Sequence, residues 1–170
     1  MRQVSFVGGK AAASSVADTS SNSQPANAIL RTADSYWFSG RDANGQGSYY
    51  KTPFPHLWWY EFPTAFVPGR ISFRPYPISD SDCNKHSYCG ATEWQFIATN
   101  DPVCSENSAW TVLCEDLSGK SFLTLSQSKY CVANPSVHKK YRCVGISVLN
   151  ALWPRVAVSG LRMWEKVAED

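Results

Sequence analysis

The sequence predicts an all-β fold in a single domain, a sandwich or barrel of short antiparallel strands. Three observations predict it: short segments in which apolar and polar residues alternate, turn-forming residues between these segments, and no apolar stripe of helical period. Aromatic residues, which favour strands, make up 14% of the 170 residues. No linker divides the chain, so one domain over residues 1–170 is expected.

The alternating segments lie in the last two thirds of the chain, between residues 58 and 164. In the first, Trp58, Tyr60 and Phe62 alternate with Trp59 and Glu61. Such a pattern points one set of side chains inward and the other outward. The same period of two recurs in segments 70–74, 93–96, 110–114, 144–148, 156–159 and 161–164. Turn-formers stand between them, for example Pro68-Gly69, Asn100-Asp101-Pro102 and Ser118-Gly119.

The segments before them are less regular. Residues 10–17 are rich in alanine but too few to predict a helix, and residues 18–27 are expected to form a polar loop. The tryptophans at 37, 59, 94, 110 and 164 are expected in the core.

Charge and hydropathy exclude several classes of function. The net charge is +2, too small to indicate a nucleic-acid-binding protein. No apolar run approaches the ~18 residues of a transmembrane segment. The first residues lack the apolar stretch of a signal peptide, which leaves an intracellular location or a trimmed secreted protein open.

The six cysteines stand at 83, 89, 104, 114, 131 and 143 and form three neighbouring pairs. The hypothesis for a secreted protein is Cys83–Cys89, Cys104–Cys114 and Cys131–Cys143, although six cysteines allow about 15 pairings. Free buried thiols are the alternative. Zinc is disfavoured because no gap has the C-x₂₋₄-C spacing.

Six segments carry a resemblance, in order and over residues 10–167. They are Pro25-Ala26-Asn27-Ala28-Ile29 with Tyr36-Trp37-Phe38-Ser39-Gly40, Trp58-Trp59-Tyr60-Glu61-Phe62, Pro68-Gly69-Arg70-Ile71-Ser72-Phe73-Arg74, Trp94-Gln95-Phe96-Ile97-Ala98-Thr99-Asn100-Asp101, Tyr141-Arg142-Cys143-Val144-Gly145-Ile146 and Val158-Ser159-Gly160-Leu161-Arg162-Met163-Trp164-Glu165. Together they resemble the discoidin, or coagulation factor 5/8 type C, family, whose fold is also called galactose-binding-like. Unlike many discoidin domains, this chain has no cysteine near either end.

The resemblance implies a jelly-roll sandwich of about eight antiparallel strands with binding loops at one end. Members of the family bind cell-surface sugars, anionic phospholipids, collagen or other proteins, and they are usually not enzymes. We therefore expect a non-catalytic, extracellular module that binds carbohydrate or a glycoconjugate. The alternatives are a protein- or phospholipid-binding adhesion domain and an intracellular scaffold domain. The sequence also lacks the common catalytic motifs of hydrolases, proteases and nucleotide-binding enzymes.

Two segments are the candidate binding loops. The first is 41–57, with exposed aromatics and a histidine suited to a sugar face: Tyr49, Tyr50, Phe54 and His56. The second is 76–92, with hydrogen-bonding groups beside an aromatic ring: Asp82, Asn84, Lys85, His86 and Tyr88. Solvated polar loops without a ligand are the alternative for both.

A structural calcium ion is found in many relatives, and the resemblance raises it as an alternative here. The acidic position of the family corresponds to Leu30, which offers no oxygen ligand from its side chain. Asp34 and Glu165 are the residues that could replace it. No other cofactor is expected.

Overall fold

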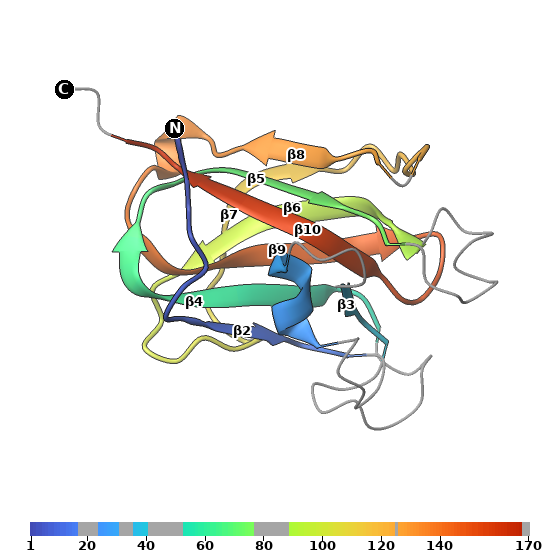
Figure 1. Ribbon diagram of the computed structural model, residues 1–170, viewed down its shortest axis with the longest axis horizontal. Helices are drawn as coiled ribbons and strands as arrows, with labels where there is room; N and C mark the ends of the chain where they lie inside the picture. Colours follow the sequence, from blue (N-terminus) through green and yellow to red (C-terminus); the bar gives the residue numbers. More distant parts are fainter. Residues whose placement is uncertain (17–23, 31–35, 41–52, 77–88, 125, 168–170) are drawn as a thin grey trace.

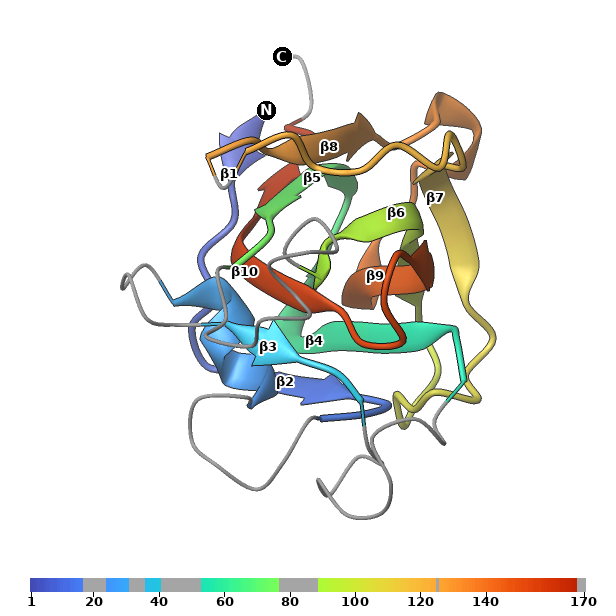
Figure 2. The same ribbon diagram turned by 90° about the vertical axis from the view of Figure 1, so that its right-hand side faces the viewer.

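The computed structural model describes residues 1–16, 24–30, 36–40, 53–76, 89–124 and 126–167. In these residues the chain forms two five-stranded antiparallel sheets that pack face to face (Figure 1, Figure 2). The β5/β10 sheet has the order β1-β10-β5-β8, with β3 also paired to β10, and the β4/β9 sheet has the order β2-β4-β9-β6-β7. The predicted all-β sandwich is confirmed. No helix of the described residues is long and apolar enough to span a bilayer.

The strands and the two short 3₁₀ helices follow one another along the chain. Their bounds are β1 Arg2–Gln3, β2 Lys10–Ala13, η2 Pro25–Ile29, β3 Trp37–Phe38, β4 His56–Phe66, β5 Pro68–Arg74, β6 Ala91–Thr99, β7 Thr111–Asp116, β8 Lys129–Val132, η4 Pro135–Val137, β9 Tyr141–Ala151 and β10 Ala157–Glu165.

The core lies between the sheets and is filled by the inward set of each alternating segment. The β4/β9 sheet contributes Trp58, Tyr60, Phe62, Trp94, Phe96, Val144, Ile146 and Val148, and the β5/β10 sheet contributes Ile71, Phe73, Val158, Leu161 and Met163. Phe73 meets Trp94 across the interface, edge to face, with ring centroids 4.8 Å apart. The period-two pattern is therefore what holds the sheets together.

Strand β10 joins two of the predicted segments through a β-bulge. The pairing with β5 shifts between Ser159 and Arg162, and Gly160 in the bulge has φ +54°. This left-handed conformation suits glycine, which has no Cβ to clash. The bulge explains why Val158 and Leu161 both point inward although they are three residues apart.

Two expectations about the core need correction. Trp37, Trp59 and Trp94 are buried, as expected, although Trp59 belongs to a smaller cluster on the outer side of the β4/β9 sheet, where half-buried Trp110 packs against it. Trp164 is only half-buried, since the inward positions of β10 belong to its neighbours in the alternation.

Residues 10–13 form the edge strand β2, because alanines fit beside the large side chains of β4.

The disulfides differ from the predicted local pairing. Cys104 is bonded to Cys143 and Cys114 to Cys131. Local pairing is wrong because each bond joins segments that are neighbours in space rather than in sequence. One bond connects β7 to β8, the edges of the two sheets, and the other connects the β6–β7 loop to β9.

Cys89 is buried and disulfide-bonded, and none of the described cysteines is free. Cys83 lies outside the described residues, so the Cys83–Cys89 pair stays a prediction. The alternative of free buried thiols is wrong for the described cysteines.

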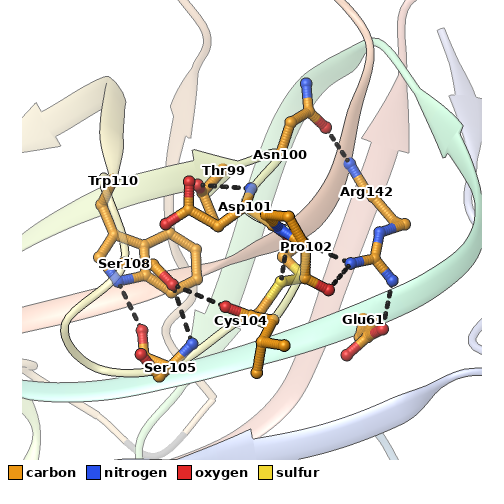
Figure 3. The surroundings of a disulfide bond; sticks show 12 residues. Glu61, Thr99, Asn100, Asp101, Pro102, Cys104, Ser105, Ser108, Trp110 and Arg142 are labelled. Carbon is orange, nitrogen blue, oxygen red and sulfur yellow. Dashed lines mark hydrogen bonds and ion pairs between the residues drawn. A yellow bond between two sulfur atoms is a disulfide. The ribbon is translucent and has the colours of Figure 1, made fainter.

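A hydrogen-bond network holds the β6–β7 loop beside the Cys104 disulfide (Figure 3). The Arg142 guanidinium forms an ion pair with Glu61 and donates to the carbonyl oxygens of Asp101 and Pro102. Asn100 accepts from the backbone N–H of Arg142 at 2.9 Å. The loop is thus fixed to β4 and β9 by covalent and polar bonds together.

Candidate ligand-binding end of the sandwich

The strand register brings the flanks of the two predicted binding loops to the same end of the sandwich. Strands β4 and β6 both begin beside the end of β9, because His56 pairs with Val148 and Ala91 with Ala151. In the other sheet, β3 and the end of β5 both lie beside the start of β10. We call this end the loop end; it lies at the right of Figure 1 and faces the viewer in Figure 2.

Four aromatic side chains gather at the loop end, and we call them the end cluster: Tyr36, Phe38, Tyr76 and Trp153. The rings of Tyr36 and Tyr76 are stacked, with centroids 4.2 Å apart and planes at 17°. Tyr36 also meets Phe38 edge-on at 6.3 Å. Phe38 is buried, whereas the other three are half-buried. The cluster is therefore a packed base that keeps three aromatic side chains partly accessible.

One cation lies against this cluster. The guanidinium carbon of Arg155 stands 4.5 Å from the centroid of the Phe38 ring, and Arg155 is 7% exposed. A cation over a ring is favoured electrostatically, more strongly where water is excluded. Trp153 and Arg155 both come from the connection between β9 and β10. Aromatic rings beside a fixed donor are the groups that bind the C–H face and the hydroxyls of a sugar.

Most of the predicted ligand contacts lie outside the described residues. They are Tyr49 and Tyr50 of the first loop and Asp82, Asn84, Lys85, His86 and Tyr88 of the second. Their roles stay predictions.

His56 lies inside the fold and not at its surface, and a role in ligand binding stays a prediction. Its side chain is fully buried. Its Nδ1 lies 2.8 Å from the hydroxyl oxygen of Ser15, and its Nε2 lies 3.1 Å from the carbonyl oxygen of Pro154. Half-buried Phe54 packs edge-on against the imidazole at 4.7 Å. His56 therefore ties the start of β4 to β2 and to the β9–β10 connection.

The burial of His56 predicts that stability depends on pH. Burial lowers the pKa of His56 below its ordinary value, and the bond to Pro154 opposes this only in part. The unfolded chain therefore binds a proton at this site more readily than the folded chain. The stability from neutral His56 is complete above about pH 6.5 and is lost as the pH falls toward the folded pKa, with a slope of at most about 1.4 kcal/mol per pH unit.

Urea unfolding between about pH 7.5 and pH 5 checks this expectation. His56→Gln should flatten the pH dependence, whereas His138→Gln, at a half-buried histidine on the far side of the fold, should retain it. Equal slopes for wild type and His56→Gln would contradict the assignment.

The residues proposed for calcium do not assemble into a site in the described part of the chain. Glu165 is ion-paired with Arg2, and the Leu30 side chain is exposed. Asp34 lies outside the described residues. The one group of metal-suited residues found among the described ones is Glu61, Cys104 and Cys143. Both of its cysteines are consumed by the disulfide, so they supply no thiolate.

The sequence did not single out the end cluster. Its members lie far apart in the sequence, with 40 positions from Tyr36 to Tyr76 and 77 from Tyr76 to Trp153. They come together in space because β3 and β5 both pair with β10. The motif Leu152-Trp153-Pro154-Arg155, an aromatic and a cation in a turn between two strands, was the available signal.

No known family profile matches the sequence, and no curated protein matches it. Solved structures do match it over nearly the whole chain.

A family 32 carbohydrate-binding module from a family 31 glycoside hydrolase of Clostridium perfringens superposes with a TM-score of 0.68 and 15% identity, over 96% of this chain and 95% of that one. The family 32 module of NanJ from the same organism, solved with galactose, gives 0.65 and 13% identity, over 95% and 97%. An F5/8 type C domain from Bacteroides fragilis gives 0.68 and 13%, over 97% and 96%. The chain therefore has the fold of carbohydrate-binding modules of family 32 and of F5/8 type C domains.

Proposed function

We propose that this protein is a non-catalytic module that binds carbohydrate at the loop end. The observation that carries the proposal is the end cluster: stacked and half-buried aromatic rings beside Arg155, at the end where the predicted binding loops begin and finish. Two carbohydrate-binding modules of the same fold were solved in complex with galactose and with GalNAc-β-1,3-galactose, and a third structure of this fold is a chitosan-binding module from a chitosanase/glucanase. The likeness extends to fold alone, so the ligand is proposed from the site.

The described residues would take distinct parts in binding. Tyr76 and Trp153 would offer ring faces to the apolar side of a pyranose. Arg155, held over Phe38, would donate to a hydroxyl or ring oxygen. Tyr49, Tyr50, Asn84 and His86 of the flanking loops are proposed to complete the site. Because the cluster is already packed, little side-chain entropy would be lost on binding.

We propose an extracellular setting for this activity. The two disulfides of the described residues are typical of secreted and cell-surface proteins, because cytosolic thiols are kept reduced. In this setting, carbohydrate binding would serve cell adhesion or would hold the protein to a glycan substrate.

Titration calorimetry with galactose, GalNAc-β-1,3-galactose and chitosan oligosaccharides tests the proposal. Trp153→Ala and Tyr76→Ala are each expected to weaken binding roughly tenfold or more, as for central aromatic contacts. Trp110→Ala is the matched control, since Trp110 is a half-buried tryptophan on the outer side of the other sheet.

Three results would contradict the proposal. One is no binding across a glycan array. Another is equal loss for the Trp153 and Trp110 variants. The third is binding to phosphatidylserine vesicles that exceeds binding to every glycan, which would favour the phospholipid-binding alternative.

A further inference from the structure

The outer face of the β5/β10 sheet carries an unusual set of side chains. Ile71, Phe73, Leu161 and Met163 point into the core, so their neighbours along β5 and β10 point outward. The outward residues are Arg70, Ser72 and Arg74 of β5, Arg162 and Trp164 of β10, and Tyr130 and Val132 of β8. We call Arg70, Arg74, Arg162, Tyr130 and Trp164 the arginine face.

Charge is divided unevenly between the two sheets. The strands of the β5/β10 sheet hold five Lys or Arg and one acid: Arg2, Arg70, Arg74, Lys129, Arg162 and Glu165. The strands of the β4/β9 sheet hold two Lys or Arg and four acids: Lys10, Arg142, Glu61, Glu93, Glu115 and Asp116. Lys129 is buried and points inward, and Arg2 is paired with Glu165, so the outward cations that remain on the strands of the β5/β10 sheet are Arg70, Arg74 and Arg162.

Arg70 is held between two aromatic rings. Its guanidinium carbon lies 4.4 Å from the centroid of Tyr130 and 4.9 Å from that of Trp164, on the two strands that flank β5. Its Nε is buried and has no hydrogen-bond partner. The two rings stand over the faces of the planar guanidinium. Its N–H groups, which lie in that plane, can still donate, and arginine binds carboxylates through such in-plane N–H groups.

Among the described residues, the other two arginines of the face have no acidic partner. The ion pairs of the described residues are Arg2 with Glu165 and Arg142 with Glu61. Arg162 lies opposite Ser72, midway between Arg70 and Arg74 along β5. Arg70 and Arg74 are four residues apart on one strand, which corresponds to roughly 13 Å. Three half-buried cations without an ion-pair partner among the described residues thus stand close together on two neighbouring strands.

We propose that the arginine face is a second binding surface, specific for a polysaccharide that carries carboxylates, such as a polyuronate. The arginines would bind successive carboxylates. Tyr130, which is 59% exposed, would contact the C–H face of a sugar unit. The surface runs along the outer side of the β5/β10 sheet. Arg70, Arg162 and Tyr130 lie away from the loop end, whereas Arg74, at the end of β5, approaches it.

The chemistry favours a polyuronate over other polyanions. A bilayer surface would need protruding apolar side chains, and this face offers only Tyr130 and Val132 at one edge. Single-stranded nucleic acid binds best where several rings stack on successive bases. Here Arg70 stands over the rings of both Tyr130 and Trp164, and of these two rings Tyr130 alone is exposed.

The test measures binding of the full chain to polygalacturonate by calorimetry at low and at high salt. Arg74→Gln combined with Arg162→Gln should weaken binding at low salt roughly tenfold or more, because it removes two charged hydrogen-bond donors from the surface. Lys10→Gln combined with Lys140→Gln removes the same charge from exposed positions on the β4/β9 side, and should change affinity less than about twofold. High salt should weaken wild-type binding.

The proposal is overturned by any of three results. They are no binding of wild type to polygalacturonate at low salt, equal losses in the two double variants, or tighter binding of a single-stranded DNA oligonucleotide than of polygalacturonate. Binding of galactose or chitosan oligosaccharide by the wild type, which keeps every arginine, reports separately on the loop end. Failure of one site is thus distinguishable from failure of the other.

Discussion

Replacement of Gly145 by alanine is expected to destabilise the protein severely. Gly145 lies in the middle of β9, paired with Trp59 on one side and Ile97 on the other. A Cβ at this position would stand 2.0 Å from the carbonyl oxygen of Trp58 and 2.7 Å from the Cα of Trp59. Both are backbone atoms of a central strand, so no side-chain rotation relieves the clash. We expect a loss of at least about 3 kcal/mol in the free energy of unfolding.

Urea unfolding followed by tryptophan fluorescence measures this loss. Gly119→Ala is the control, because a Cβ there meets nothing closer than 4.0 Å and the cost comes only from a φ of +70°. That cost is about 1–2 kcal/mol. A Gly145→Ala variant no less stable than Gly119→Ala would show that β4 and β9 lie further apart than described.

Removal of the Cys104–Cys143 disulfide is expected to cost about 4 kcal/mol, and removal of the Cys114–Cys131 disulfide about 3 kcal/mol. The difference arises because the bonds close loops with sequence separations of 39 and 17 residues, and a longer loop restricts the unfolded chain more. The measurement is urea unfolding of the two double cysteine-to-alanine variants under non-reducing conditions.

Mass spectrometry of a non-reduced digest provides the control on connectivity. It should find the peptide with Cys104 linked to that with Cys143, and the peptide with Cys114 linked to that with Cys131. Linkage of Cys104 to Cys114 would restore the local pairing and refute the structure at this point.

The sequence predicted the layers of the fold well and their connections poorly. The alternation around Trp58 and Ile146 assigns the inward faces correctly, because each strand's pattern depends only on its own residues. The cysteine pairing fails because β7 and β8 become neighbours through the packing of two sheets, which no local pattern encodes. The alternation of inward and outward residues along β10 is also interrupted at the bulge of Gly160, because one extra residue there shifts the pattern.

The candidate site, like the fold, could be predicted from the sequence only in part. Residue chemistry identified loops whose flanks do meet at one end, but it chose His56, which the fold buries under Phe54. The end cluster could not be predicted, because Tyr36 and Tyr76 become stacked only when β3 and β5 take their places around β10. The arginine face was visible as Arg70, Arg74 and Arg162 at outward positions, yet its lack of acidic partners is a property of the folded surface.

The pairing of β1 with β10 has a consequence for engineering. Arg2 lies opposite Glu165, so the two ends of the described chain leave the sandwich side by side, away from the loop end (Figure 1). Adjacent termini permit circular permutation and grafting into a host loop with short spacers. A host protein that accepted this domain in one of its loops would hold the end cluster on the side facing away from the host.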